Sequence, residues 1–178
     1  MSEKLATLLT KKIGKLYPRS ETDLIKIQYG LELMLENLFS LLLIFIVALI
    51  SGFFKEAMFT YMAFAFLRLS AGGRHCETKM GCSFVTALVV LAGGWVSSMF
   101  NMPLFAGVIA FIVLEICLFI FAPRGTENNP IRPNLKKYMK IKSMIIALIY
   151  LLIFIFDKNR IVGTSFLMGT IAEVLSII

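Results

Sequence analysis

The chain is poor in charged residues and almost lacks histidine. Of its 178 residues only 16% are charged, and it has one histidine, one tryptophan and three cysteines, whereas 58% are hydrophobic. Three cysteines are too few, and odd in number, for a disulfide framework, so they are interpreted as thiols. A soluble domain of this size keeps a large fraction of its surface exposed to solvent, so its core cannot bury so many apolar side chains. These features exclude a soluble enzyme, a disordered chain and a collagen-like fibre, and they indicate a polytopic membrane protein.

Six apolar segments follow one another and predict six transmembrane helices. They cover residues 27–50, 53–69, 84–100, 102–122, 141–156 and 161–178. Several are nearer to 16 residues than to the roughly 20 that cross a bilayer squarely, which suggests local thinning or burial among neighbouring helices. Ahead of them, leucines alternate with lysines in residues 1–22, as is typical of an amphipathic helix on an anionic membrane surface. The expected fold is all-α, and without internal repeats residues 1–178 are expected to form a single domain.

The basic residues predict how the chain is oriented in the membrane. The net charge is +7, but no aromatic-basic surface motif accompanies it, so no nucleic-acid partner is expected. Of 18 Lys and Arg residues, 15 lie before the first span, or in or directly beside the connections from the second to the third span and from the fourth to the fifth. The other three are Lys55, Lys158 and Arg160. Since cytoplasmic loops carry the excess of Lys and Arg, both termini and the two basic loops are predicted to be cytoplasmic.

The stretch 68–82, on this predicted cytoplasmic side, holds the residues best suited to chemistry. It contains His75, the only histidine, and two of the three cysteines, Cys76 and Cys82. A thiolate is a nucleophile, and an imidazole within about 3 Å can take the thiol proton. On one continuous helix His75 and Cys82 would lie about 10.5 Å apart along the axis, so direct proton transfer requires a bend between them. Gly81 permits such a bend.

Two other interpretations of the same stretch remain open. His75 is equally consistent with a solvated loop residue, and cysteines often serve as inert small hydrophobes. His75, Cys76 and Cys82 are also soft metal ligands, but a fourth Cys or His and a CxxC spacing are missing. No metal and no cofactor are therefore expected.

Acidic residues in or near the apolar segments offer a second set of candidates. Charge is costly in lipid, so such residues usually face the protein interior or a wet cavity. Glu32 and Glu36 share one helical face near the start of the first span, and Glu115 is the deepest acid. Glu173, near the end of the sixth span, is expected to extend to the cytoplasmic interface. An alternative function is therefore a small transporter or channel that uses Glu115 and Glu32.

The run Arg68-x5-Arg-His75-x6-Cys82 resembles the accessory gene regulator B family of Gram-positive quorum sensing. The resemblance extends over most of the chain, including Gly30-Leu-Glu32 and Phe121-Ala-Pro-x-x-Thr followed by Asn-Pro-Ile131. Members of this family are membrane cysteine endopeptidases that process the propeptide of a cyclic autoinducer. The resemblance implies a multi-pass peptidase domain in the cell membrane of a Gram-positive bacterium. Residues 68–82 would then be the catalytic segment, on the cytoplasmic side.

The resemblance also assigns roles to individual residues. His75 matches the catalytic histidine and Cys82 the nucleophile. Arg68 matches a functionally important arginine, and Glu32 falls where the family has an acid or amide that is important for activity. Arg74 is a further supporting residue, and either Glu77 or Glu32 is a candidate to orient the imidazole. The supporting and substrate-binding set is therefore Arg68, Glu32, Arg74 and Glu77.

The implied reaction is cleavage followed by ring closure. Cys82 attacks a backbone carbonyl of a precursor, with His75 as general base and then acid, and the C-terminal tail leaves. A cysteine or serine within the precursor then attacks the acyl-enzyme thioester, which closes a thiolactone or lactone. The expected partners are a propeptide with an amphipathic N-terminal helix and an acidic C-terminal tail, and anionic lipid. A homodimer is compatible with the resemblance.

Overall fold

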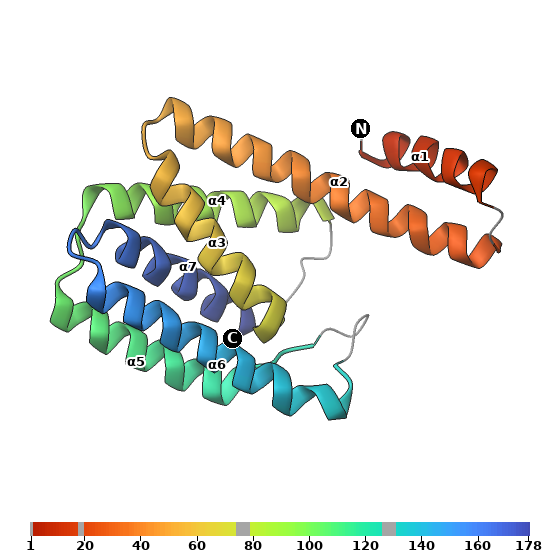
Figure 1. The fold of residues 1–178 in the computed structure, drawn as a ribbon. Helices are drawn as coiled ribbons and strands as arrows, with labels where there is room; N and C mark the ends of the chain where they lie inside the picture. The colour runs from red at the N-terminus through yellow and green to blue at the C-terminus, as the bar shows by residue number, and fades with distance from the viewer. Residues whose placement is uncertain (1, 18–19, 74–78, 126–130) are drawn as a thin grey trace.

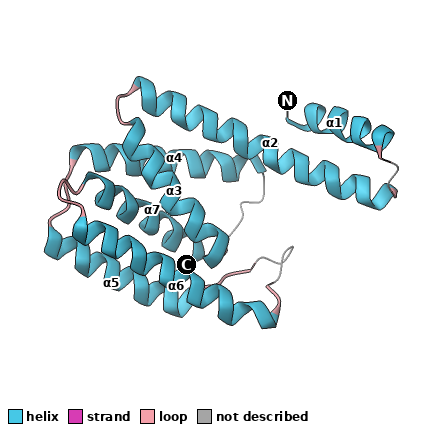
Figure 2. Ribbon diagram, in the orientation of Figure 1, coloured by secondary structure: helices cyan, strands magenta, loops and turns pink. Residues whose placement is uncertain are grey.

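The computed structural model describes residues 2–17, 20–73, 79–125 and 131–178 (Figure 1). These residues form seven α-helices and no strand (Figure 2), so the predicted all-α fold is confirmed for the described part of the chain. The helices are α1 (Ser2–Leu16), α2 (Glu21–Ile50), α3 (Phe54–Ala71), α4 (Lys79–Met99), α5 (Leu104–Phe121), α6 (Pro133–Phe156) and α7 (Ile161–Ile177). Each of the six predicted apolar segments corresponds to one helix, from α2 to α7.

Three helices, α2, α4 and α6, begin five to eight residues before the apolar segments that predicted them. The helix α2 begins at Glu21 rather than near residue 27, because Ser20 accepts a hydrogen bond from the backbone N–H of Asp23 and caps the helix. The helix α6 begins at Pro133 rather than near 141, since proline is well suited to the first turn. A capping serine and a first-turn proline mark these starts, whereas hydropathy marks only the part of each helix that is removed from water. At the N-terminus, α1 ends at Leu16 instead of near residue 22.

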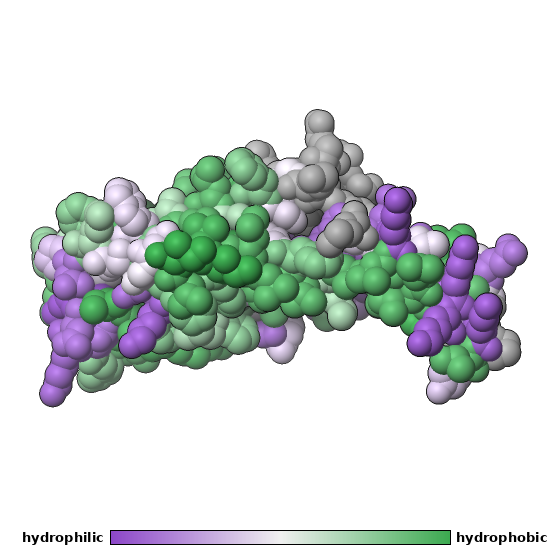
Figure 3. Space-filling view, turned by 90° about the horizontal axis from the view of Figure 1, so that it is seen from above, coloured by the Kyte–Doolittle hydropathy of each residue, from purple (hydrophilic) through white to green (hydrophobic). Residues whose placement is uncertain are grey.

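The helices are those of a membrane protein. Among the described residues, four helices are long and apolar enough to cross a bilayer, namely α2, α4, α5 and α6. The helix α7 is apolar but shorter, with 17 residues. Figure 3 shows apolar residues over the middle of the molecule and polar residues gathered toward its two ends. Six spans with both termini in the cytoplasm stay a prediction.

Consecutive helices alternate in direction, so the connections gather at two ends of the bundle (Figure 1). One end carries the loops 51–53, 100–103 and 157–160; Lys158 and Arg160 lie in the last of these loops, and Lys55 lies in the first turn of α3 at the same end. The other end carries the last residues of α3, α5 and α7 and the first residues of α4 and α6, and α1 and the start of α2 lie beyond it as a hairpin. At 30 residues α2 is about 45 Å long, which exceeds the roughly 30 Å thickness of a hydrocarbon core.

The helix α7 is the centre of the bundle. It packs against α3, α4, α5 and α6, and its contact with α3 is the most extensive between any two helices of the described chain. Small residues allow this close approach. A Cβ on Gly169 would lie 2.5 Å from the carbonyl oxygen of Thr60 and 2.6 Å from the Cβ of Ala63. The close packing of α3 and α7 brings the end of α7 to the end of α3, where the candidate site lies.

Candidate active site

Cys82 lies in the first turn of α4, at the wall of a cavity of about 70 Å³. The cavity lies between α3, α4 and α7. Its polar lining residues are Arg68, Cys82, Thr86 and Ser176, and the rest of its lining is apolar. The backbone N–H groups in the first turn of a helix lack partners within that helix and place partial positive charge there. Cys82 therefore lies in the first turn of a helix, and it lines the same cavity as Arg68.

Arg68 is held in place by two residues of α7. Its Nη1 donates a hydrogen bond to Oγ of Ser176 at 2.5 Å and forms an ion pair with Oε2 of Glu173 at 3.6 Å. The Ser176 hydroxyl in turn donates to Oε2 of Glu173 at 3.2 Å. Glu173 and Ser176 are three residues apart on α7 and so share one face of the helix. The three side chains form a closed triangle, named here the Arg68 network.

Two glycines lead the chain away from α3 directly over this network. Gly72 and Gly73 have φ of 75° and 138°, which side chains rarely tolerate. A Cβ on Gly73 would overlap the Arg68 guanidinium and lie 2.8 Å from Oγ of Ser176. A Cβ on Gly72 would overlap the carbonyl oxygen of Arg124. Glycine is required at both positions because the backbone passes so close to its neighbours.

Arg124 joins the ends of α3 and α7. Its backbone N–H donates to the carbonyl of Ala71 at 2.8 Å, and its carbonyl accepts from Gly73 at 3.0 Å. Its Nη1 donates to the carbonyls of Ile177 and Ile178 at 2.6 and 2.7 Å. These carbonyls end a helix and have no partner within it, so a guanidinium there stabilises the helix end. The loop after α5, predicted from sequence to be part of the family pattern, thus holds the backbone beside the Arg68 network.

Of the other predicted site residues, only Glu32 is among the described residues. His75, Arg74 and Glu77 lie outside the described residues, as does Cys76. Glu32 is on α2 and accepts a hydrogen bond from Gln28 at 3.1 Å. Gln28 also donates to Thr7 of α1 at 3.2 Å, so Glu32 lies in the hairpin of α1 and α2. Along α2 it is eight residues, or about 12 Å, before Ser40, whose hydroxyl contacts the backbone of Ser83 beside Cys82.

The expectation for Glu173 was wrong. Instead of extending to the interface, its side chain is 0% exposed and pairs with Arg68. The sequence shows an acid near the end of an apolar helix, and from that position alone an interfacial location is the simpler expectation. The packing of α3 against α7 instead turns this residue toward an arginine 105 positions earlier in the chain. The only sequence signal was the presence of Arg68 near the end of a neighbouring apolar segment.

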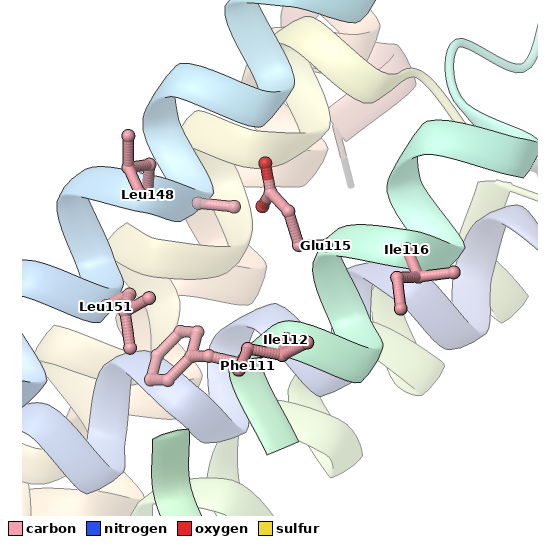
Figure 4. A pocket seen from close by; sticks show the side chains of 7 residues that line it. Phe111, Ile112, Glu115, Ile116, Leu148 and Leu151 are labelled. Atoms are coloured by element: carbon pink, nitrogen blue, oxygen red, sulfur yellow. The ribbon is translucent and has the colours of Figure 1, made fainter. Parts of the chain in front are cut away.

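Glu115 lies beside a separate cavity of about 250 Å³ between α5 and α6. Figure 4 shows its carboxyl group pointing from α5 toward α6, among apolar side chains such as Phe111 and Leu148. The residues that line this cavity include no second ionisable group. Glu115 and Glu32, the two acids of the transporter hypothesis, thus lie in different parts of the molecule. Within the described residues, no group of three or more His, Cys, Asp or Glu could hold a metal ion.

Comparison with known proteins gives the family. The family model for accessory gene regulator B matches residues 2–177. A putative AgrB-like protein of Clostridium acetobutylicum is 28% identical, over 99% of this chain and 85% of that protein. A putative AgrB-like protein of Listeria monocytogenes is also 28% identical, over 99% and 86%. Protein FsrB of Enterococcus faecalis is 28% identical over 85% of this chain and 63% of its own length.

No solved structure matches this chain. The family match nevertheless covers nearly every residue, including Arg68, Cys82 and the glycines between them. The chain belongs to the accessory gene regulator B family.

Proposed function

We propose that residues 1–178 form a membrane cysteine endopeptidase that removes the C-terminal tail of an autoinducer propeptide and promotes its cyclisation. The observation that supports this most is the place of Cys82. A thiol lies in the first turn of a helix and shares a cavity with two members of the partly buried Arg68 network, in a chain of the accessory gene regulator B family. This family is associated with the processing of autoinducer peptides in quorum sensing.

In the proposed reaction His75 takes the Cys82 thiol proton, and the thiolate attacks the carbonyl carbon before the tail. Negative charge then develops on the carbonyl oxygen, and the Arg68 guanidinium stabilises it. The C–N bond breaks, His75 returns the proton to the leaving amine, and a C–S thioester remains. His75 then takes the proton of a cysteine or serine side chain of the bound precursor, and this side chain attacks the thioester. The ring closes as the Cys82 thiolate leaves.

Cyclisation requires that the internal nucleophile react before water does. The cavity beside Cys82 is small and mostly apolar, which limits the water around the thioester. A thioester and a thiolactone have nearly equal energies, so ring closure gains little from the bond energies. Whether the ring or the hydrolysed acid forms therefore depends on how well water is excluded. The cavity thus favours a ring over a hydrolysed acid.

The other predicted residues have supporting roles in this proposal. Arg74 adds positive charge beside His75, and Glu77 orients the imidazole. Glu32, in the hairpin of α1 and α2, contributes to precursor binding rather than to proton transfer at Cys82. The lysines of α1 and of the first turns of α6 are positively charged and would attract the acidic tail of the precursor and anionic lipid.

A covalent intermediate is the direct test of this function. The precursor for this test is a peptide with an amphipathic N-terminal helix, an internal Cys or Ser, and an acidic C-terminal tail. Replacement of that internal nucleophile by alanine blocks ring closure, so the acyl-enzyme should accumulate. Mass spectrometry is expected to find the N-terminal part of the precursor on Cys82, in a bond that hydroxylamine cleaves. Tail release without an adduct, or an adduct on Cys117 instead, would contradict the proposal.

The proposed topology has six spans, with both termini and the site on the cytoplasmic side. Lys158 and Arg132 are exposed residues at opposite ends of the bundle, which makes them matched reporters. In a chain whose native cysteines are replaced by serine, Lys158→Cys is expected to react with a membrane-impermeant maleimide in intact cells. Arg132→Cys should react only after the cytoplasmic face is opened. The reverse labelling pattern would refute this topology.

A further inference from the structure

Glu173 is a buried acid for which the proposed reaction has no use. Its side chain is fully buried, and its Oε1 has no hydrogen-bond partner among the described residues. We propose that Glu173 is a positioning residue, which holds the Arg68 guanidinium at the wall of the Cys82 cavity. This inference rests on the proposed function, because it explains how Arg68 is placed to stabilise the developing charge.

The geometry of the Arg68 network gives Glu173 this role. Its Oε2 attracts Nη1 of Arg68 at 3.6 Å and also accepts the Ser176 hydroxyl at 3.2 Å. That hydroxyl oxygen is thereby turned to accept Nη1 of Arg68 at 2.5 Å. Arg68 and Ser176 line the cavity, whereas Glu173 stands behind them. Glu173 therefore acts on the cavity through Arg68 and not by direct contact with a substrate.

Stability alone does not account for this pair. Apolar residues of similar volume often replace a buried ion pair with no loss of stability, whereas a buried acid with one unpartnered oxygen costs free energy. Ionisable groups in apolar helices usually pair with one another and mark functional sites. The Arg68 guanidinium also packs under Gly73, where the chain leaves α3 for the predicted catalytic segment. Loss of its anchor would therefore disturb both the cavity wall and the start of that segment.

Two substitutions of Glu173 separate positioning by charge from simple packing. Glu173→Gln keeps the volume but removes the charge, and Glu173→Asp keeps the charge but shortens the side chain. If Glu173 anchors Arg68, Gln should lower kcat for tail release at least about tenfold, with KM changed less than about threefold. Asp should retain more activity than Gln. The opposite order, or a wild-type kcat in both variants, would overturn the inference.

Glu115→Gln is the matched control, since it neutralises another acid of the bundle away from the site. It should leave kcat unchanged. If neither Glu173 variant yields folded protein, the double variant Arg68→Met/Glu173→Leu leaves no buried charge and should fold. Its kcat is expected to be at least as low as that of Glu173→Gln, and a wild-type kcat would overturn the inference.

Failure of this inference can be told apart from failure of the proposed function. If Glu173→Gln cleaves normally and Cys82→Ala does not, only the role of Glu173 is wrong. If Cys82→Ala itself cleaves the precursor, the proposed function is wrong.

Discussion

Cys82→Ala is expected to abolish release of the precursor tail, with a loss of at least about 10⁴-fold in rate. Removal of a nucleophile eliminates the covalent route, and what remains comes from binding and charge stabilisation alone. Cys82 is half-buried in the first turn of α4 and borders the cavity, so alanine removes the sulfur with little disturbance of packing. The measurement is the rate at which an epitope tag on the tail is released by the purified protein.

The other two cysteines are the controls for this experiment. Cys117 is a half-buried residue of α5 that packs against the main core cluster, away from the cavity. Cys117→Ala and Cys76→Ala should therefore release the tail at rates within a few-fold of wild type. Normal release by Cys82→Ala, or a loss in Cys76→Ala as large as that in Cys82→Ala, would refute Cys82 as the nucleophile.

Gly73→Ala is expected to have the second largest effect, a fall of at least about 100-fold in tail release. The added Cβ would overlap the end of the Arg68 side chain and lie 2.8 Å from Oγ of Ser176. The guanidinium is flexible and can move away, but then it no longer lines the cavity beside Cys82. Loss of one donor to a developing oxyanion typically costs about 10²- to 10³-fold in rate. A φ of 138° adds backbone strain.

Gly30→Ala provides the matched control for a glycine-to-alanine change. A Cβ on Gly30 meets no atom within 4 Å, and alanine is the better helix former inside α2. Thermal unfolding in detergent should show both variants folded, with normal activity only in Gly30→Ala. A normal rate of release in Gly73→Ala would mean that the position of Arg68 does not matter for the reaction.

The sequence was sufficient to predict the helices but not all of their ends. Apolar runs report where a helix avoids water, and each of the six corresponds to one helix of the structure. Helix starts depend on single residues outside the apolar runs, such as Ser20, which caps α2, and Pro133, which is suited to the first turn of α6. The central place of α7 could not be predicted either. A uniformly apolar helix with scattered glycines does not show which of its faces meets another helix.

Two residues at the candidate site were already candidates from the sequence. Arg68 and Cys82 were expected to act together, and the structure places both at one cavity. The partners of Arg68 are Glu173 and Ser176, which lie more than 100 positions later in the chain, on a helix that periodicity alone could not orient. The backbone hydrogen bonds that join Arg124 to Ala71 and Gly73 were equally unpredictable, because they depend on where two loops meet. These contacts depend on tertiary packing, which the local sequence pattern does not show.

The central position of α7 has a consequence for biosynthesis. The ribosome delivers Cys82 to the membrane long before Glu173 and Ser176, since α7 is made after α1 to α6. Until α7 inserts, Arg68 lacks its anchor and the cavity lacks its third wall. A chain interrupted before α7 would therefore carry the thiol without the surroundings that we propose for catalysis. Assembly of the bundle would itself delay activation until synthesis has passed Ser176, so unfinished chains would not cleave peptides in the membrane.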